Sequence, residues 1–137
     1  MTMASEIPSS VQDLLGDRPL VCALSTINPD GQPHSVPVWF DFDGTNIRVN
    51  SPDTTRKARN MNPGTKVAVL VIDPENAYHW VEVMGHVIEV RGETEGGRDH
   101  INKLSMKYRG DPVYKSWGGK VESRSMYVIE PDKVHAV

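Results

Sequence analysis

The chain has 137 residues and a formal net charge of −3, from 15 Lys and Arg against 18 Asp and Glu, and it fits one domain over residues 1–137 with a loose N-terminus at residues 1–7. This acidic balance argues against a nucleic-acid partner, and no apolar run approaches the roughly 20 residues of a membrane span. A single cysteine, Cys22, excludes an intramolecular disulfide and indicates a cytoplasmic, reducing setting.

The first part of the chain predicts a short helix followed by a hairpin. Residues 8–16 carry an apolar stripe and end in glycine, as a short amphipathic helix at one end of a sheet would. The apolar run over residues 19–28 leads into Asn28-Pro29-Asp30-Gly31, a strong turn signal. A second strand follows over residues 34–42, so the two strands should pair.

The second strand has two different faces. Val36 and Val38 belong to an apolar face that predicts core. Pro37 and Trp39 lie on the opposite face, where proline marks an edge or bulge and a large aromatic favours an amphipathic wall. A tight turn should then lead into a strand over residues 46–50.

A short basic segment follows that strand, over residues 51–61. It contains Arg56, Lys57 and Arg59 in an otherwise acidic chain. Asp53 or Thr54 is expected to cap a helix of about two turns. The free N–H groups of a helix start, together with these cations, suit a phosphate or a carboxylate. Because successive helical residues are about 100° apart, at most two of the three cations should point at one anion.

The second half of the chain adds strands, one helix and one long loop. We expect a strand covered on both faces over residues 66–72, a long strand over 78–91, a helix capped by Thr94 over 94–109, an irregular loop over 110–119, and a strand over 124–130 that residues 134–137 extend. Gly85, in the middle of the long strand, predicts a bulge or a close approach. About six strands joined largely by hairpins, with three short helices, predict a small antiparallel α+β barrel.

Motifs for most enzyme chemistry are absent from the sequence. The five histidines show no metal-binding spacing, so no metal site is expected. There is no GxSxG, GxGxxG or P-loop motif, and Cys22 lies in an apolar strand as a small hydrophobic residue would. The remaining candidates for a binding site are the strand face that carries Pro37 and Trp39 and the basic helix over residues 51–61. Together they suit a ligand with a flat ring at one end and a phosphate at the other.

These pieces resemble the split β-barrel flavin/deazaflavin oxidoreductases, the superfamily that includes pyridoxamine phosphate oxidase. The similarity is greatest to the PPOX-class F420-dependent enzymes. It covers residues from about 20 to 137 and is carried by LSTINPDGQP at 24–33, VPVWF at 36–40, RKARN at 56–60, VLVIDP at 69–74 and GHV at 85–87. The resemblance implies a Greek-key-like split barrel of the FMN-binding type, and a homodimer with cofactor sites at the subunit interface.

The resemblance also implies which residues bind the cofactor, whose ring carries the hydride so that no catalytic side chain is required. They are Val36, Pro37, Val38 and Trp39 along the ring, Ser51, Thr54 and Thr55 near the ribityl and phosphate portion, Arg56 and Lys57 on the phosphate with Asn60, and Trp80 on the substrate side. Tyr114 and Trp117 are further candidates for walls of the substrate side. Alternatively, Trp80 packs in the dimer interface and Trp117 holds a surface loop.

Three functions fit the sequence, and a fourth is weighed against them. The first is an oxidoreductase that uses reduced coenzyme F420 to transfer hydride to an unsaturated, conjugated or quinone-like small molecule. The second is an FMN-dependent oxidase or reductase of the pyridoxamine phosphate oxidase type. The third is a non-catalytic module that binds a flavin, a deazaflavin or haem. The fourth, a barrel for single-stranded nucleic acid, conflicts with the acidic balance.

Overall fold

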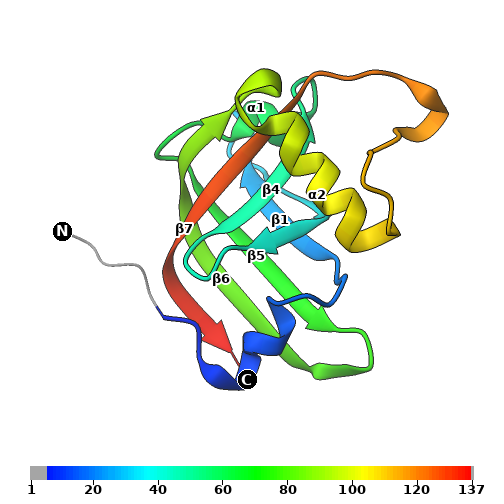
Figure 1. Cartoon of the computed structure of the whole chain (residues 1–137). Coiled ribbons are helices and arrows are strands. Elements are labelled where there is room, and N and C mark those ends of the chain that lie inside the picture. The colour runs from blue at the N-terminus through cyan, green and yellow to red at the C-terminus, as the bar shows by residue number, and fades with distance from the viewer. Residues whose placement is uncertain (1–5, 137) are drawn as a thin grey trace.

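A single antiparallel sheet of seven strands organises the chain in the computed structural model, which describes residues 6–136 (Figure 1). The strands are β1 (Cys22–Ile27), β2 (Pro33–Val38), β3 (Phe40–Phe42), β4 (Ile47–Pro52), β5 (Lys66–Asp73), β6 (Asn76–Arg91) and β7 (Arg124–Ala136). The helices are the α-helices α1 (Arg56–Asn60) and α2 (Gly97–Arg109) and the short 3-10 helices η1 (Ser9–Leu14), η2 (Glu93–Glu95) and η3 (Trp117–Gly119).

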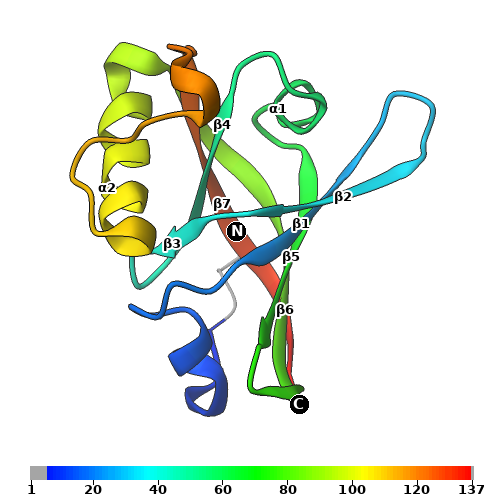
Figure 2. The same cartoon turned by 90° about the vertical axis from the view of Figure 1, so that its right-hand side faces the viewer.

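The sheet curls into a half-barrel of the split-barrel type. Its strand order is β2-β1-β5-β6-β7-β4-β3, so the two edge strands, β2 and β3, are neighbours in the chain. Only Trp39 separates them, and Figure 2 shows β2 running on into β3. The split in the barrel is therefore bridged by the chain itself at Trp39.

The number of strands corrects one expectation. Residues 34–42 were expected to form one strand, but β2 pairs with β1 whereas β3 pairs with β4. The strand is interrupted at Trp39 because the two halves pair with different strands, β1 and β4, on either side of the split. At the C-terminal end, residues 124–136 form one strand, β7. The last expected strand, over residues 124–130, is therefore extended toward the C-terminus as predicted.

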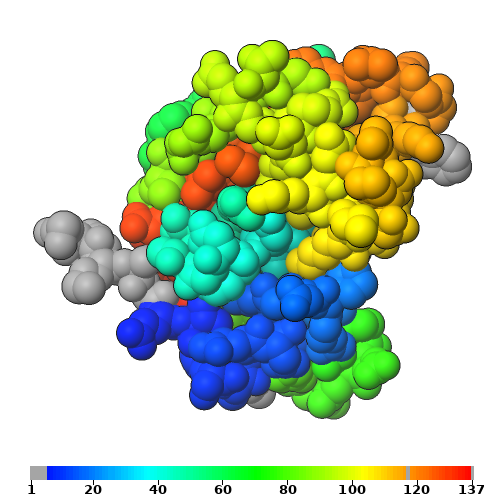
Figure 3. Space-filling model, in the orientation of Figure 1, coloured from blue at the N-terminus to red at the C-terminus, as the bar shows by residue number. Residues whose placement is uncertain are grey.

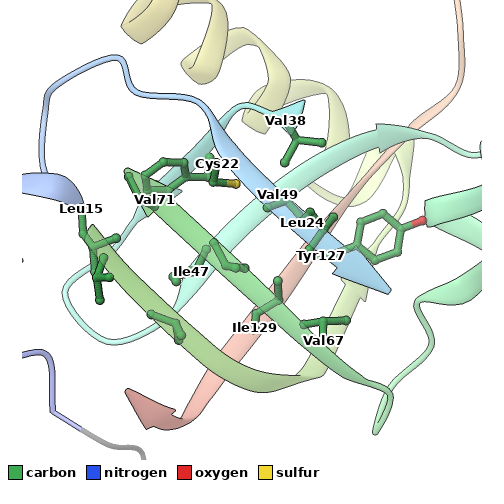
Figure 4. Packing of buried hydrophobic residues seen from close by; sticks show 14 of the residues in the cluster. Leu15, Cys22, Leu24, Val38, Ile47, Val49, Val67, Val71, Tyr127 and Ile129 are labelled. Carbon is green, nitrogen blue, oxygen red and sulfur yellow. The ribbon is translucent and has the colours of Figure 1, made fainter. Parts of the chain in front are cut away.

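The core fills the inside of the curl (Figure 4). Alternation along β6 places Val81, Val83 and Val87 there, each fully buried. Strand β5 buries one face in the same way, but Ile72 on its other face is 44% exposed and Leu70 is only half-buried. The expectation that β5 is covered on both faces is thus wrong for the single chain, because no second layer from residues 6–136 lies over its outer side.

Gly85 confirms the predicted close approach. A Cβ atom at this position would lie 2.3 Å from the carbonyl oxygen of Glu130 in β7. The register between β6 and β7 also shifts between Met84 and Gly85. The glycine is therefore required by the way the two strands meet.

Helix α2 packs against β7 and β4. It buries Ile101 and Leu104 and ends at Gly110, whose φ of 70° is the left-handed conformation typical of a C-cap. Its N-cap is Gly96, whereas the expected Thr94 lies within η2, so the helix begins three residues later than predicted. The loop after α2 packs along it on the surface (Figure 3). Within residues 6–136, every helix is too short or too polar to span a bilayer.

Candidate functional site

A hollow of about 210 Å³ lies beside the split in the barrel. Strands β2 and β4, helices α1 and α2, the loop after α2 and the start of β7 all contribute to it. Its apolar residues are Pro37, Val38, Ile101 and Leu104, its aromatic ones are Trp39 and Tyr114, and its cations are Lys57, Arg109 and Arg124. The structure thus brings four of the predicted site residues, Pro37, Val38, Trp39 and Lys57, into one cavity.

Helix α1 presents Lys57 to this hollow. Its N-cap is Thr55, whose hydroxyl accepts a hydrogen bond from the N–H of Ala58 at 3.2 Å. The expected caps are therefore wrong. Thr54 is exposed, and the Asp53 carboxylate instead accepts hydrogen bonds from the hydroxyls of Ser123 and Ser125, at 2.8 and 2.6 Å.

Lys57 is a half-buried cation without a carboxylate within ion-pair distance among the described residues. Burial lowers the pKa of its ammonium group, and the nearby positive charge of Arg124 lowers it further, while Glu122 acts in the opposite direction. A bound anion would relieve both unfavourable effects. Lys57 is therefore the group in α1 best suited to bind one.

The other two cations of α1 lie differently. Arg59 is exposed, and Arg56 is half-buried but does not line the hollow. The Nε atom of Arg56 is buried and has no hydrogen-bond partner among the described residues, so it is an unsatisfied donor. Of the three cations only Lys57 lines the hollow, so the roles of Arg56 and Lys57 at one phosphate, and the limit of two cations on one anion, stay predictions.

The remaining predicted polar residues hold α1 in place. The hydroxyls of Ser51 and Thr55 lie 2.6 Å apart, and Ser51 is fully buried. The side-chain amide of Asn60 donates to the hydroxyl of Thr26 and to the amide oxygen of Asn28, both at 2.9 Å. These hydrogen bonds connect α1 to β1 and β4. They fix the position of α1, and so they fix where its residue Lys57 lies in the hollow.

Trp39 is fixed by aromatic and cationic neighbours. Its ring stacks on Tyr108 with centroids 4.9 Å apart and meets the edge of Tyr114 at 6.1 Å. The guanidinium carbon of Arg109 lies 4.9 Å from the centre of the Trp39 ring. Residues of α2 and of the loop that follows it therefore fix the ring of Trp39, which forms the wall of the hollow at the split.

We expect Tyr108→Phe to destabilise the protein by about 1–3 kcal/mol. The hydroxyl of Tyr108 donates to the carbonyl oxygen of Leu20 at 2.5 Å and accepts from the N–H of Phe40 at 3.1 Å. Phenylalanine keeps the stack on Trp39 but leaves both backbone groups without this partner. Urea unfolding measures the difference. The exposed Tyr78→Phe is the control, and equal stability of the two variants would contradict the expectation.

A buried chain of polar residues ends at the hollow, and the sequence analysis missed it. The Nε of Arg124 donates to the side-chain oxygen of Asn50 at 2.8 Å. The amide nitrogen of Asn50 is within hydrogen-bond distance of the carbonyl oxygen of Gly97 (2.9 Å) and of Nδ1 of His100 (3.2 Å). The Nε2 of His100 in turn lies 3.0 Å from Asp41. A histidine beside the predicted apolar stripe of α2 was the only signal in the sequence for this chain.

Asp41 is the last residue of this series of hydrogen bonds, and its side chain is ionised. Desolvation opposes its charge, but hydrogen bonds from His100 and Arg48 outweigh it and lower its pKa to about 2. We expect Asp41→Asn to cost about 2 kcal/mol at neutral pH. Because the folded pKa lies below the unfolded one, this contribution is present above about pH 4 and disappears as the pH falls toward about 2. Urea unfolding of both proteins across this range checks it, and a constant difference would contradict it.

The other predicted residues lie away from the hollow, with one exception. Trp80 is half-buried on the outer face of β6, with its ring 5.0 Å from that of His135. Val36 borders a different hollow, of about 300 Å³, on the outer side of β1, β2 and β5. Tyr114 is the exception, since it lines the hollow beside the split. The side chain of Trp117 lies outside the described residues.

Two clusters elsewhere bring one histidine and two carboxylates within ligand distance of each other. They are Asp13 with Asp73 and His79, and His86 with Glu130 and Asp132. In each, the imidazole already pairs with a carboxylate, and Asp13 and Asp73 also pair with Arg18. The side chains of both clusters are therefore paired with one another or with Arg18, as in surface ion pairs.

Comparisons with known proteins agree with this architecture. The family described as pyridoxamine 5'-phosphate oxidase matches residues 7–137. A solved structure of an F420 reductase is 33% identical, with a TM-score of 0.78 and coverage of 94% of this chain and 98% of its own. HupZ from Group A Streptococcus (18% identity, TM-score 0.63, 96% and 94% coverage) and a pyridoxamine 5'-phosphate oxidase-like protein from Listeria innocua (19%, 0.63, 94% and 93%) share the fold. The comparison with curated proteins finds no match.

Proposed function

Because the chain belongs to the pyridoxamine 5'-phosphate oxidase family of split β-barrel proteins, we propose that it is an F420-dependent oxidoreductase. Its substrate is an unsaturated, conjugated or quinone-like small molecule. The observation that carries this proposal is the hollow beside the split, where an apolar wall and Lys57, a cation without an ion-pair partner in the described part of the chain, face one cavity. The 33% identity to an F420 reductase over nearly the whole chain favours the deazaflavin.

The residues present fit such a cofactor. A flat ring system needs apolar contact, which Pro37 and Val38 offer. A phosphate needs cations, which Lys57 and Arg124 offer in the same hollow. The buried Nε of Arg56 in α1, which has no hydrogen-bond partner among the described residues, is a further unsatisfied donor.

The roles of the side chains follow from these positions. When bound, reduced F420 supplies the hydride. Lys57 holds the phosphate end, Pro37 and Val38 contact the ring, and the fixed ring of Trp39 closes the wall at the split and excludes water. Ser51, Thr55 and Asn60 keep α1 in the position that this binding needs.

We propose that two copies of the chain form a homodimer, with the cofactor sites completed at the interface. The support is an apolar outer face of the sheet, where Val21 and Ile27 are each 51% exposed and Ile72 is 44% exposed. Hollows of about 300 and 430 Å³ lie on the same strands. A second copy would cover the outer side of β5 and bring Trp80 into the interface. Light scattering checks the expected dimer mass, and a monomer at micromolar concentration would contradict it.

FMN is the second candidate cofactor. The match to the pyridoxamine 5'-phosphate oxidase family favours it, and its ring and phosphate make the same demands on the hollow. The enzyme would then be an FMN-dependent oxidase or reductase.

A visible absorption spectrum distinguishes the two cofactors. The purified protein is incubated separately with F420 and with FMN, and the excess is removed on a desalting column. We expect the F420 spectrum to remain with the protein and the FMN spectrum to be weak or absent. A yellow protein as purified would favour FMN instead. Retention of neither cofactor would contradict the proposed function.

A further inference from the structure

We propose that Arg124 is a second anion-binding side chain of the hollow, beside Lys57, and that Asn50 and His100 set the direction of its guanidinium group. The ligand group is a phosphate or a carboxylate. The proposal deepens the proposed function, on which it rests for the identity of the ligand. The anion-binding role itself follows from the chain's own contacts.

Arg124 is a buried cation whose charge is only partly balanced. The residue is 8% exposed, although it lines the hollow. Its carboxylate partner, Glu122, lies 3.3 Å from one terminal nitrogen, and the Glu122 side chain is 39% exposed, so water screens that pair. The ring of Tyr114 lies 4.8 Å from the guanidinium carbon and supports the cation from one side.

Lys57 and Arg124 share this cavity, and of the two only Arg124 has a carboxylate partner among the described residues, the partly exposed Glu122. Lys57 and Arg124 are close enough for the charge of Arg124 to disfavour the charged form of Lys57. Burying two like charges side by side is unfavourable in the free protein. An anion placed between them reverses this effect, because each cation then gains a charge-assisted hydrogen bond.

The buried polar chain fixes which way Arg124 points. Asn50 is 5% exposed, and its amide nitrogen donates to Gly97 and faces His100, which forces its oxygen toward Arg124. For Nδ1 of His100 to accept from Asn50, the proton must sit on Nε2, where it is donated to Asp41. A flipped Asn50 amide would set its N–H groups against the Nε–H of Arg124. Asn50 and His100 are therefore positioning residues.

The test compares Arg124→Gln with Arg124→Lys, using four probes. FMN and F420 carry phosphate, riboflavin does not, and inorganic pyrophosphate is an anion without a ring. For Arg124→Gln we expect the Kd of FMN and F420 to rise about tenfold or more, with that of riboflavin unchanged. Pyrophosphate should raise the Tm of the native protein but not that of Arg124→Gln. Arg124→Lys, which keeps the charge without the guanidinium fork, should lie between them.

The positioning role is tested through His100. In His100→Gln, the side-chain amide can still donate to Asp41 and accept from Asn50, so anion affinity should be largely kept. His100→Leu should weaken F420 binding in the native background but not in the Arg124→Gln background, because its effect passes through Arg124. Equal losses in both backgrounds would overturn the positioning role. If His100→Leu does not fold, equal F420 affinities of Asn50→Leu and the native protein would overturn it instead.

The outcomes separate this proposal from the proposed function. If neither cofactor binds but pyrophosphate stabilises the native protein and not Arg124→Gln, the proposed function fails and the role of Arg124 stands. If Arg124→Gln binds FMN, F420 and pyrophosphate as the native protein does, the role of Arg124 is overturned. If the native protein binds none of the probes, both proposals are overturned.

Discussion

The Lys57→Ala substitution is expected to raise the Kd of F420 about 10- to 100-fold. Lys57 lines the hollow and has no carboxylate within ion-pair distance among the described residues, so its charge is free for the phosphate of the cofactor. A hydrogen bond to a charged group contributes about 1.5–3 kcal/mol, which corresponds to this range of affinity. The free energy of unfolding should change by less than about 1 kcal/mol, since removing a half-buried unpaired cation also removes its desolvation cost.

Arg59→Ala is the matched control. Arg59 is a cation in the same helix, two residues further on, but it is exposed and does not line the hollow. Fluorescence titration with F420 and urea unfolding should be carried out on both variants. Equal affinities for Lys57→Ala and the native protein would refute the role of Lys57 as phosphate anchor. Equal losses in both variants would show a general electrostatic effect instead of a contact.

Local signals in the sequence predicted most of the fold. The Asn28-Pro29-Asp30-Gly31 turn and the alternation along β6 depend on neighbouring residues, and both are confirmed. The division between β2 and β3 was missed because nothing local distinguishes one strand from two at Trp39. That division depends on pairing with β1 and β4, which lie next to the two opposite edges of the sheet. The type of barrel, in turn, came from the resemblance and not from the hairpin pattern alone.

The candidate site was predictable only in part, for the same reason. Lys57 was found because three cations close together in an acidic chain are visible in sequence. Arg124 follows 67 positions later as one of 15 basic residues, and only the folded chain places it beside Lys57. Asn50 and His100 were missed because a polar residue becomes informative only when it is known to be buried.

Gly97 connects the stability of the fold to this site. It is the first residue of α2, and its carbonyl oxygen accepts the hydrogen bond from the amide of Asn50. A Cβ atom at Gly97 would lie 2.2 Å from the carbonyl oxygen of Arg124 and 2.9 Å from that of Gly92. Both are backbone atoms, so no side-chain rotation can relieve the contact, and either the start of α2 or the start of β7 must move.

We therefore expect Gly97→Ala to destabilise the protein by about 2–3 kcal/mol, as overpacking against backbone does. The shift should also displace the guanidinium of Arg124 and raise the Kd of the phosphate-bearing cofactor. Gly92→Ala is the control, because a Cβ atom there meets nothing within 4 Å and its φ of −71° suits any residue. Urea unfolding and cofactor titration of the two variants give the comparison. A Gly97→Ala protein as stable as Gly92→Ala would mean that α2 and β7 separate freely, and the fixed direction of Arg124 would then lose its structural basis.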